Sequence, residues 1–298
     1  MSQFTAINLA LVAAPDVVEN LDYEVIYQQM LDDLLQRMPE LDALLESEPA
    51  LKILQVAAYR ELILRQRIND AAHAVMLPYA RGKDLENLGA LFGVTRLLVT
   101  PADPSAVPPK PAVYEGDEEL RYRIQLSLEG LSTAGPEGAY IFHAMSADGE
   151  VLDASAVSDK PGEVQITVLA RTNPGTPSNA LLSLVNAAVN AEDVRPLTDL
   201  VSVKAAKIVE YKIEAVLYFF AGPDRGVIMQ NAQNSAKTYA QTQHRLGLDV
   251  TLSGLYAALH QPGVQRVELI SPKQNLVLDR QSASYCSAIN LSYGGLDE

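Results

Sequence analysis

The stretch Asp148–Leu169, DGEVLDASAVSDKPGEVQITVL, marks the point where the chain changes from a helical to a strand pattern. Two short β-prone runs, Val151–Val157 and Val164–Leu169, flank the segment Asp159–Gly162. The proline and glycine in that segment favour a tight turn between extended segments. The pattern therefore predicts a β-hairpin.

The sequence after this hairpin predicts further small α/β structure. A helix at Pro177–Asn190 and a strand at Leu200–Ala205 complete the order ββαβ. A related order is expected to follow, with no residue-level repeat to prove duplication. Its elements are a strand at Ile208–Phe220, a helix at Arg225–Arg245, a shorter helix near Leu252–His260, and strands beginning at Val264 and Leu276.

The sequence before the hairpin predicts helices, because apolar residues recur there at three- and four-residue steps. The first two run from Tyr23 to Met38 and from Ala50 to Leu77. A short third helix is expected to be capped by Asp84 and to end at Gly93. In the second helix, the residues expected to face inward are Ile53, Leu54, Ala57, Leu62, Ile63 and Ile68.

A proline-rich segment, Thr100–Pro111, separates these helices from two more at Asp117–Glu129 and Pro136–Ala147. Its prolines favour an extended linker or a surface loop. The predicted fold class is α+β, a helical N-terminal half followed by one or two small α/β sandwich domains with mixed or antiparallel sheets. The predicted domains are a helical domain at 1–98, a linker and second helical segment at 99–148, a ββαβ domain at 149–206 and a C-terminal α/β domain at 207–298.

The charge balance argues against several classes of partner. The formal net charge of −14 and pI of about 4.7 disfavour nucleic acid and anionic membrane surfaces. Acidic residues concentrate in Asp16–Glu48, which favours either a solvated helix face or an interaction face. The single cysteine, Cys286, excludes an intramolecular disulfide, and no secretion signal or membrane-spanning run is expected.

No pattern of catalytic or cofactor-binding residues stands out. The phosphate-binding loop and the dinucleotide-binding glycine pattern are both missing from the sequence. Ser132 and Thr133 lie in GLSTAG, which fails the spacing of a nucleophile elbow, so they are interpreted as helix caps. The acidic trio Asp117–Glu119 suits the start of a helix. The histidines His73, His143, His244 and His260 lack the spacing of a zinc motif and are interpreted as packing or surface residues.

Three sequence blocks resemble the baseplate J-like family. They are LPYARGKDLENLGALFGV at Leu77–Val94, the segment from Asp117-Glu118-Glu119-Leu120-Arg121 through Gly135-Pro136 to Tyr140, and Arg195-Pro196-Leu197-Thr198-Asp199 before a predicted strand. The blocks span the middle of the chain, and the part after Ile208 matches less distinctively. Within them, Gly82 and Gly93 are interpreted as helix ends. Arg121, Arg123 and Arg195 are expected to form ion pairs, either within the chain or with a partner.

The resemblance implies a wedge subunit of a contractile-tail baseplate, in a phage virion or a tail-like particle, assembled in the bacterial host cytoplasm. It implies contacts with other wedge proteins, with copies of the same chain and with hub or sheath-initiating proteins, and neither catalytic residues nor a cofactor. A hinge at Thr100–Pro111 is a further hypothesis.

Two other functions stay open at this stage. A tail-associated cell-wall hydrolase would need paired carboxylates, for which Glu163 and Asp193 are one arbitrary choice. A carbohydrate-binding module is disfavoured by the absence of tryptophan, and Tyr218, Phe219 and Phe220 are interpreted as strand core.

Overall fold

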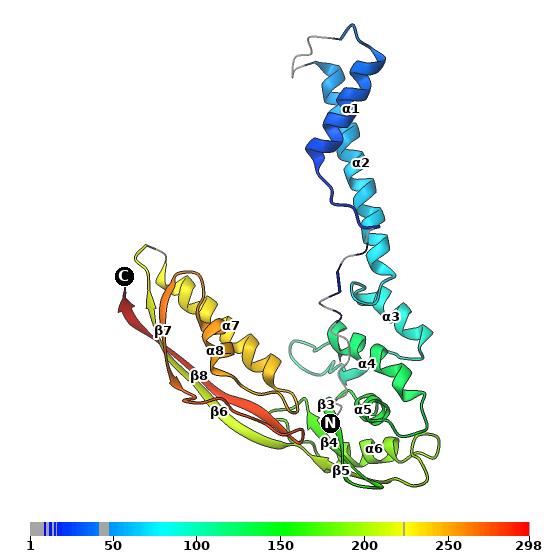
Figure 1. Cartoon of the computed structure of the whole chain (residues 1–298), viewed down its shortest axis with the longest axis vertical. Helices are drawn as coiled ribbons and strands as arrows, with labels where there is room; N and C mark the ends of the chain where they lie inside the picture. Colours follow the sequence, from blue (N-terminus) through cyan, green and yellow to red (C-terminus); the bar gives the residue numbers. More distant parts are fainter. Residues whose placement is uncertain are drawn as a thin grey trace. The chain divides into compact units, whose positions relative to one another are not determined.

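The computed structural model describes residues 9, 12, 13, 15, 17–41, 48–222 and 224–297 (Figure 1). Its contacts divide the chain into two units, which are described separately. The helical unit comprises the described residues of Thr5–Thr95 together with Asp117–Arg121. The sheet unit comprises Arg96–Gly116 and the described residues from Tyr122 onward.

The helical unit is built on two packed helices, α1 (Tyr23–Arg37) and α2 (Pro49–Ala74). Asp22 caps α1 by accepting hydrogen bonds from the backbone N–H groups of Glu24 and Val25. The Asn69 side chain, buried on α2, binds both backbone groups of Glu19, at 2.8 Å and 3.1 Å. These two bonds fasten the segment before α1 to the side of α2, and they satisfy a polar group that would be costly to bury unpaired.

The prediction of which α2 residues face inward is partly wrong. Ile53, Ile63 and Ile68 are exposed, whereas the buried residues of the helix are Leu51, Ala58 and Asn69. Apolar residues occupy a wide part of the circumference of α2, and α1, which packs along α2, covers only one stripe of it. A wide apolar surface is therefore left open.

Helix α3 (Gly82–Leu91) corrects two capping predictions. Its N-cap is Arg81, and Asp84 lies within the first turn, where its charge still suits the helix dipole. Gly82 begins this helix, with φ of +51°, and does not end the preceding one. Gly93 follows the end of α3 in the left-handed conformation, φ +70°, as predicted.

The proline-rich segment folds back on itself and is not an extended linker. Strands β1 (Leu98–Thr100) and β2 (Val113–Tyr114) pair antiparallel, and a bridge between Asp103 and Lys110 closes the loop further out. Asp103 also accepts bonds from Ser105 and from the backbone of Ala106, so the turn is organised locally. A hinge in this segment stays a prediction.

The first three-stranded sheet has the order β3-β4-β5. Strands β3 (Val151–Lys160) and β4 (Glu163–Ala170) form the predicted hairpin, and β5 (Leu200–Ala205) joins β4 in parallel after helix α6 (Asn179–Val189). Helices α4 (Asp117–Gly130) and α5 (Glu137–Ser146) precede the hairpin. Helices α5 and α6 pack on the sheet and share its apolar core.

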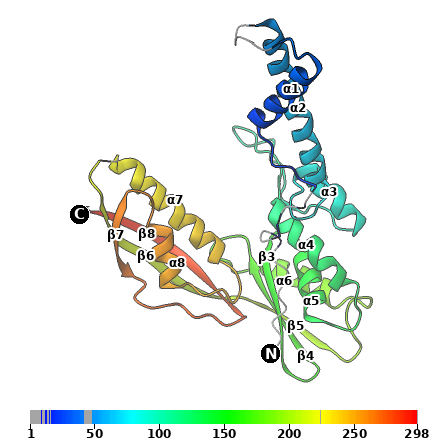
Figure 2. The ribbon, with the colours of Figure 1, turned by 45° about the horizontal axis from the view of Figure 1, so that its top comes forward.

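The second three-stranded sheet has the order β7-β6-β8. Strand β6 (Lys207–Phe219) pairs antiparallel with β7 (Val264–Ser271) and parallel with β8 (Ser282–Leu296). Helices α7 (Arg225–Gln243) and α8 (Leu252–Leu259) lie on one side of this sheet (Figure 2). Both sheets are mixed, and the α+β prediction is confirmed.

Two predictions for the second sheet need correction. The last strand begins at Ser282, because Leu276 makes an isolated bridge to Val250 instead of starting a strand. The aromatic run is not all core: Phe219 is buried, Tyr218 is half-buried, and Phe220 is exposed just beyond the end of β6.

The two sheets meet within the sheet unit through a small apolar cluster that includes Leu169, Ala206 and Ala283. Polar contacts surround this cluster. The Asp153 carboxylate accepts a hydrogen bond from the backbone N–H of Leu246 at 2.9 Å, and the Ser155 hydroxyl donates to the backbone carbonyl of Arg280 at 2.6 Å. Burial raises the pKa of Asp153, although the Arg245 guanidinium opposes that shift.

Candidate functional site

The exposed face of α2 carries a row of large apolar side chains. Six large apolar side chains on it are between 42% and 69% exposed. Most of them are three or four residues apart, and Ile63 and Leu64 are adjacent, which places all six on one half of the helix. The helix has 26 residues and is about 39 Å long at 1.5 Å per residue. They are Ile53, Val56, Tyr59, Ile63, Leu64 and Ile68, and they are called the α2 face below.

Basic side chains interrupt the α2 face. Lys52, Arg60 and Arg67 are exposed at helical spacings that place them among the apolar residues. The neighbouring helix α1 presents exposed carboxylates instead, at Glu24, Asp32 and Asp33. The paired helices thus offer an apolar and basic surface beside an acidic one.

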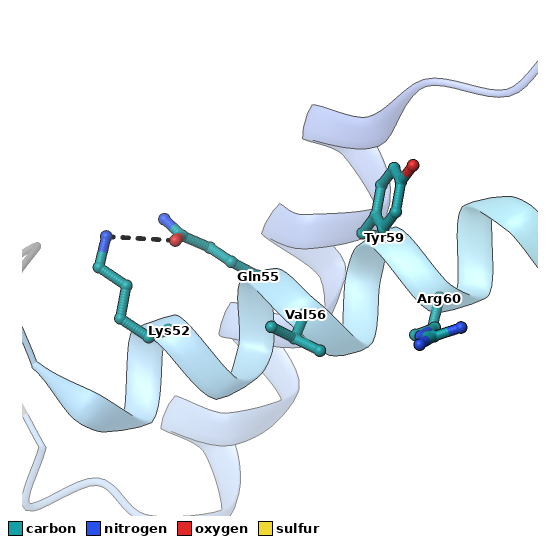
Figure 3. A pocket seen from close by; sticks show the side chains of 5 residues that line it. All are labelled: Lys52, Gln55, Val56, Tyr59 and Arg60. Carbon is teal, nitrogen blue, oxygen red and sulfur yellow. Dashed lines mark hydrogen bonds between the residues drawn. The ribbon is translucent and has the colours of Figure 1, made fainter.

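A hollow of about 530 Å³ lies on the α2 face (Figure 3). Its lining residues are Lys52, Gln55, Val56, Tyr59 and Arg60, all from α2, and the Lys52 ammonium donates to the Gln55 amide oxygen at 3.3 Å. A site for a small molecule normally encloses most of its ligand between several elements. A hollow lined by one helix suits a side chain of a protein partner better.

Arg121 ties the start of α4 to the turn between α2 and α3. Its guanidinium donates to the backbone carbonyls of Leu77 and Ala80, at 2.8 Å and 2.7 Å, and to the Glu118 carboxylate at 2.7 Å. The Arg121 side chain is buried while Glu118 is exposed. The two carbonyls are therefore the partners that hold this arginine, because an exposed ion pair contributes little.

Arg123 and Glu115 form an ion pair in the sheet unit, with 3.1 Å between the guanidinium nitrogen and the carboxylate oxygen. Their side chains are 4% and 3% exposed. Glu115 also accepts a hydrogen bond from the backbone N–H of Leu97 at 3.0 Å, and Arg96 donates to its backbone carbonyl at 2.7 Å. These contacts join α4 to the β1–β2 hairpin through buried charge.

Arg195 lies in the turn before β5, where its guanidinium donates to the backbone carbonyl of Asp199. The Asp199 carboxylate in turn accepts a hydrogen bond from the Tyr140 hydroxyl at 2.8 Å. Burial and the bond to Asp199 raise the pKa of Tyr140, so the phenol stays protonated and donates. Arg195 and Tyr140 come from different sequence blocks of the family resemblance, and both are hydrogen-bonded to Asp199.

The residues considered for catalysis occupy separate structural positions. His73 packs on the Tyr79 ring, with centroids 4.8 Å apart, and His143 lies 3.2 Å from the Gly130 carbonyl. Glu163 pairs with Lys160 at the hairpin turn, and Asp193 lies after α6. Asp117 accepts a hydrogen bond from the backbone N–H of Gly82 at 3.1 Å.

Within the described residues, no three histidine, cysteine, aspartate or glutamate side chains gather in a way that could hold a metal ion. None of the helices in the described part of the chain is long and apolar enough to cross a membrane.

Sequence reasoning missed the buried carboxylate of Glu115 and the exposure of the α2 face. Glu115 stands between β2 and α4, next to a predicted helix start, where a charged residue normally faces water. The exposure of α2 had a signal in the sequence: apolar residues occupy more than half of its circumference between Leu51 and Ile68, which is more than one neighbouring helix covers.

Comparisons with known proteins identify the family of this chain. The family model "Baseplate J-like N-terminal domain" matches residues 46–103, and "Baseplate J-like central domain" matches residues 132–205. "Baseplate protein J" of Escherichia phage P2 is 49% identical over 299 residues, covering 98% of this chain and 99% of that protein.

A similarity to a solved structure is weaker. A chain of the anti-feeding prophage baseplate is 17% identical, with a TM-score of 0.38, and the match covers 61% of this chain and 44% of that one. The identity to the P2 protein over nearly the full length of both chains, with two matching family models, shows that the chain belongs to the baseplate J-like family.

Proposed function

We propose that this protein is a structural wedge subunit of a contractile-tail baseplate and not an enzyme. Family membership supports a structural role in a tail baseplate, and the α2 face is the observation that carries the finer proposal. An apolar surface of this length on a free chain costs free energy in water unless another protein covers it. The partners we propose are other wedge proteins and copies of this chain, with the hub or sheath-initiating proteins as further neighbours.

The chemistry of the α2 face supports packing against another helix. Apolar residues at helical spacing are the pattern by which an amphipathic helix recognises a second one. The basic residues Lys52, Arg60 and Arg67 would favour a partner helix with carboxylates along its edge, and would disfavour a basic one. In this proposal the assembly forms in the bacterial host cytoplasm and ends in the baseplate of a virion or tail-like particle.

The arginines Arg121 and Arg123 have an internal role in this proposal. Arg121 and Arg123 are buried against groups of their own units, so we propose that they hold the subunit's shape and leave partner contacts to the exposed helix.

The test is size-exclusion chromatography with light scattering on the purified chain, alone and mixed with the products of the neighbouring tail genes. We expect a complex of defined mass with at least one of them. Leu64→Glu removes an exposed leucine from the α2 face, and burying such a side chain contributes about 1.5–3 kcal/mol, or roughly 10- to 100-fold in affinity.

Leu184→Glu is the matched control, because Leu184 is exposed on α6 to a similar degree, 51% against 63% for Leu64. Circular dichroism of both variants should match the parent chain, since neither position is buried. Equal complex formation by the Leu64→Glu and Leu184→Glu variants would remove the α2 face from the proposal. A chain that stays alone with every tail partner, or that cleaves cell wall, would overturn the proposal itself.

A further inference from the structure

The two three-stranded sheets are joined by a connector of one residue. Strand β5 ends at Ala205 and β6 begins at Lys207, so Ala206 alone separates them. The matching family model for the central domain ends at residue 205. Small domains joined in this way move relative to each other unless their interface is large and apolar. The apolar cluster at this junction has three buried residues, so polar contacts decide whether the junction bends.

The connector is hydrogen-bonded to both sheets. The backbone N–H of Ala206 donates to the Val168 carbonyl of β4 at 2.9 Å. The next N–H, that of Lys207, donates to the Gln281 carbonyl just before β8, also at 2.9 Å. A rotation about the backbone here would leave buried polar groups of the main chain unpaired, which is costly.

The first sheet is covered on both of its faces. Helices α5 and α6 cover the face that carries Ala154 and Ala156. Because side chains alternate along a strand, Asp153 and Ser155 lie on the other face. Ser155 is 6% exposed, and Thr167, its partner on β4, is 1% exposed. This second face is therefore buried as well, and elements of the second sheet contact it.

The connection between α7 and α8 supplies part of this cover. Its residues 244–247 are called the strap below. The Arg245 guanidinium donates to the Leu152 carbonyl of β3, and the Leu246 backbone N–H donates to the Asp153 carboxylate at 2.9 Å. These bonds involve charged groups and are directional, so they fix an orientation in a way that an apolar contact does not.

The strap is also bonded to the second sheet. Leu246 forms an antiparallel bridge with Ala283 at the start of β8. The backbone N–H of Gly247 donates to the Ser282 carbonyl at 3.0 Å. Four consecutive residues are thus bonded to β3 of one sheet and to β8 of the other.

A second tie lies beside the strap. The Ser155 hydroxyl donates to the Arg280 backbone carbonyl at 2.6 Å, and the Arg280 guanidinium pairs with the Glu137 carboxylate of α5. Arg280 directly precedes the start of β8, so it joins the second sheet to the first. Its ion pair is partly exposed and contributes less than a buried pair would, which leaves the strap as the main tie.

We propose that the strap is a lock that holds the two sheets as one rigid body, so that the Ala206 connector is not a hinge. A bend at Ala206 would move β3 away from β8 and break the bonds of the strap to one of them. A change of shape of this chain during assembly or contraction then leaves residues 151–296 unchanged. The inference goes beyond the wedge role and does not depend on it.

The test measures the distance between two spin labels in the full chain. Asn186→Cys on α6 and Lys237→Cys on α7 provide exposed positions for the labels. Cys286→Ser removes the native thiol and keeps a donor for the Ala288 carbonyl. Pulsed electron paramagnetic resonance of this labelled chain should give one narrow distribution of distances.

The lock is opened with Asp153→Ala combined with Arg245→Met, which removes both bonds of the strap to β3. The distance distribution should broaden, and the Leu246 amide should exchange roughly 10- to 100-fold faster, because it loses a charged acceptor. Asp249→Ala is the matched control. The Asp249 carboxylate lies in the same connection between α7 and α8, but it accepts from the Leu278 N–H at 2.8 Å, and it should leave the distribution narrow.

Three results would overturn the proposal. They are a broad distribution in the labelled chain without further changes, a distribution in the double variant as narrow as without them, and equal broadening by Asp249→Ala. Where circular dichroism shows that the double variant does not fold, Arg245→Met alone takes its place. It should broaden the distribution to a smaller extent, and an unchanged width in that variant also overturns the proposal.

Discussion

Removing Arg123 should destabilise the sheet unit strongly, because it removes a buried positive charge that pairs with the buried Glu115 carboxylate. The two side chains are 4% and 3% exposed, so water does not replace the lost partner. Breaking a buried pair by removing one member typically costs about 3–5 kcal/mol. Glu115 keeps its hydrogen bond from the Leu97 backbone, which argues for the lower half of that range.

The Arg123→Met variant is compared with the parent chain in urea and thermal unfolding, with circular dichroism as the signal. A unit of this size loses about 2–4 °C of Tm per kcal/mol, so a decrease of roughly 6–15 °C is expected. Adding Glu115→Gln to Arg123→Met removes the buried negative charge of Glu115 and should recover part of the lost stability.

Lys160→Met is the control, because the Lys160–Glu163 pair is exposed, at 71% and 56%, and exposed pairs contribute about 0–1 kcal/mol. The reasoning is refuted if Arg123→Met costs no more than this control, or if the double variant is less stable than Arg123→Met alone.

Three further predictions follow from single contacts. Arg121→Lys should lower the free energy of unfolding by about 1.5–3 kcal/mol, because a lysine cannot reproduce the guanidinium fork that donates to the Leu77 and Ala80 carbonyls. Glu118→Gln should lower it by less than about 1 kcal/mol, because the Glu118 carboxylate is exposed. Urea unfolding compares the two variants, and equal losses would contradict the assignment of the carbonyls as the main partners. Gly149→Ala should destabilise by about 1–3 kcal/mol or prevent folding, since an added Cβ would lie 2.1 Å from the Leu98 carbonyl oxygen; normal thermal stability would exclude this close approach. Burial raises the pKa of the Cys286 thiol, so iodoacetamide at pH 8 should modify it more slowly than a peptide cysteine until urea unfolds the chain; equal rates by mass spectrometry would show an open thiol.

The sequence predicted local elements well where periodicity and turn chemistry agree. The β3–β4 hairpin and the strand Leu200–Ala205 follow from β-prone runs and a proline-glycine turn, which are short-range signals. The start of β8 was placed too early, because its position is set by pairing with β6, about 75 residues away, and not by local composition.

The candidate surfaces were predictable only in part. The apolar period of α2 identified a helix, but the exposure of Ile53, Ile63 and Ile68 depends on how much of that helix α1 covers, which is a tertiary property. The partners of Arg123 and Arg195 also depend on turns that bring neighbouring segments together, so residue type alone left intramolecular and intermolecular pairing open.

The most direct test of the wedge proposal is a cryo-EM reconstruction of the baseplate from the particle that carries this gene. The proposal predicts density for this chain in several copies around the central hub, with the α2 face covered by helices of neighbouring subunits. A complete baseplate without this chain, or with its α2 face open to solvent in every copy, would contradict it.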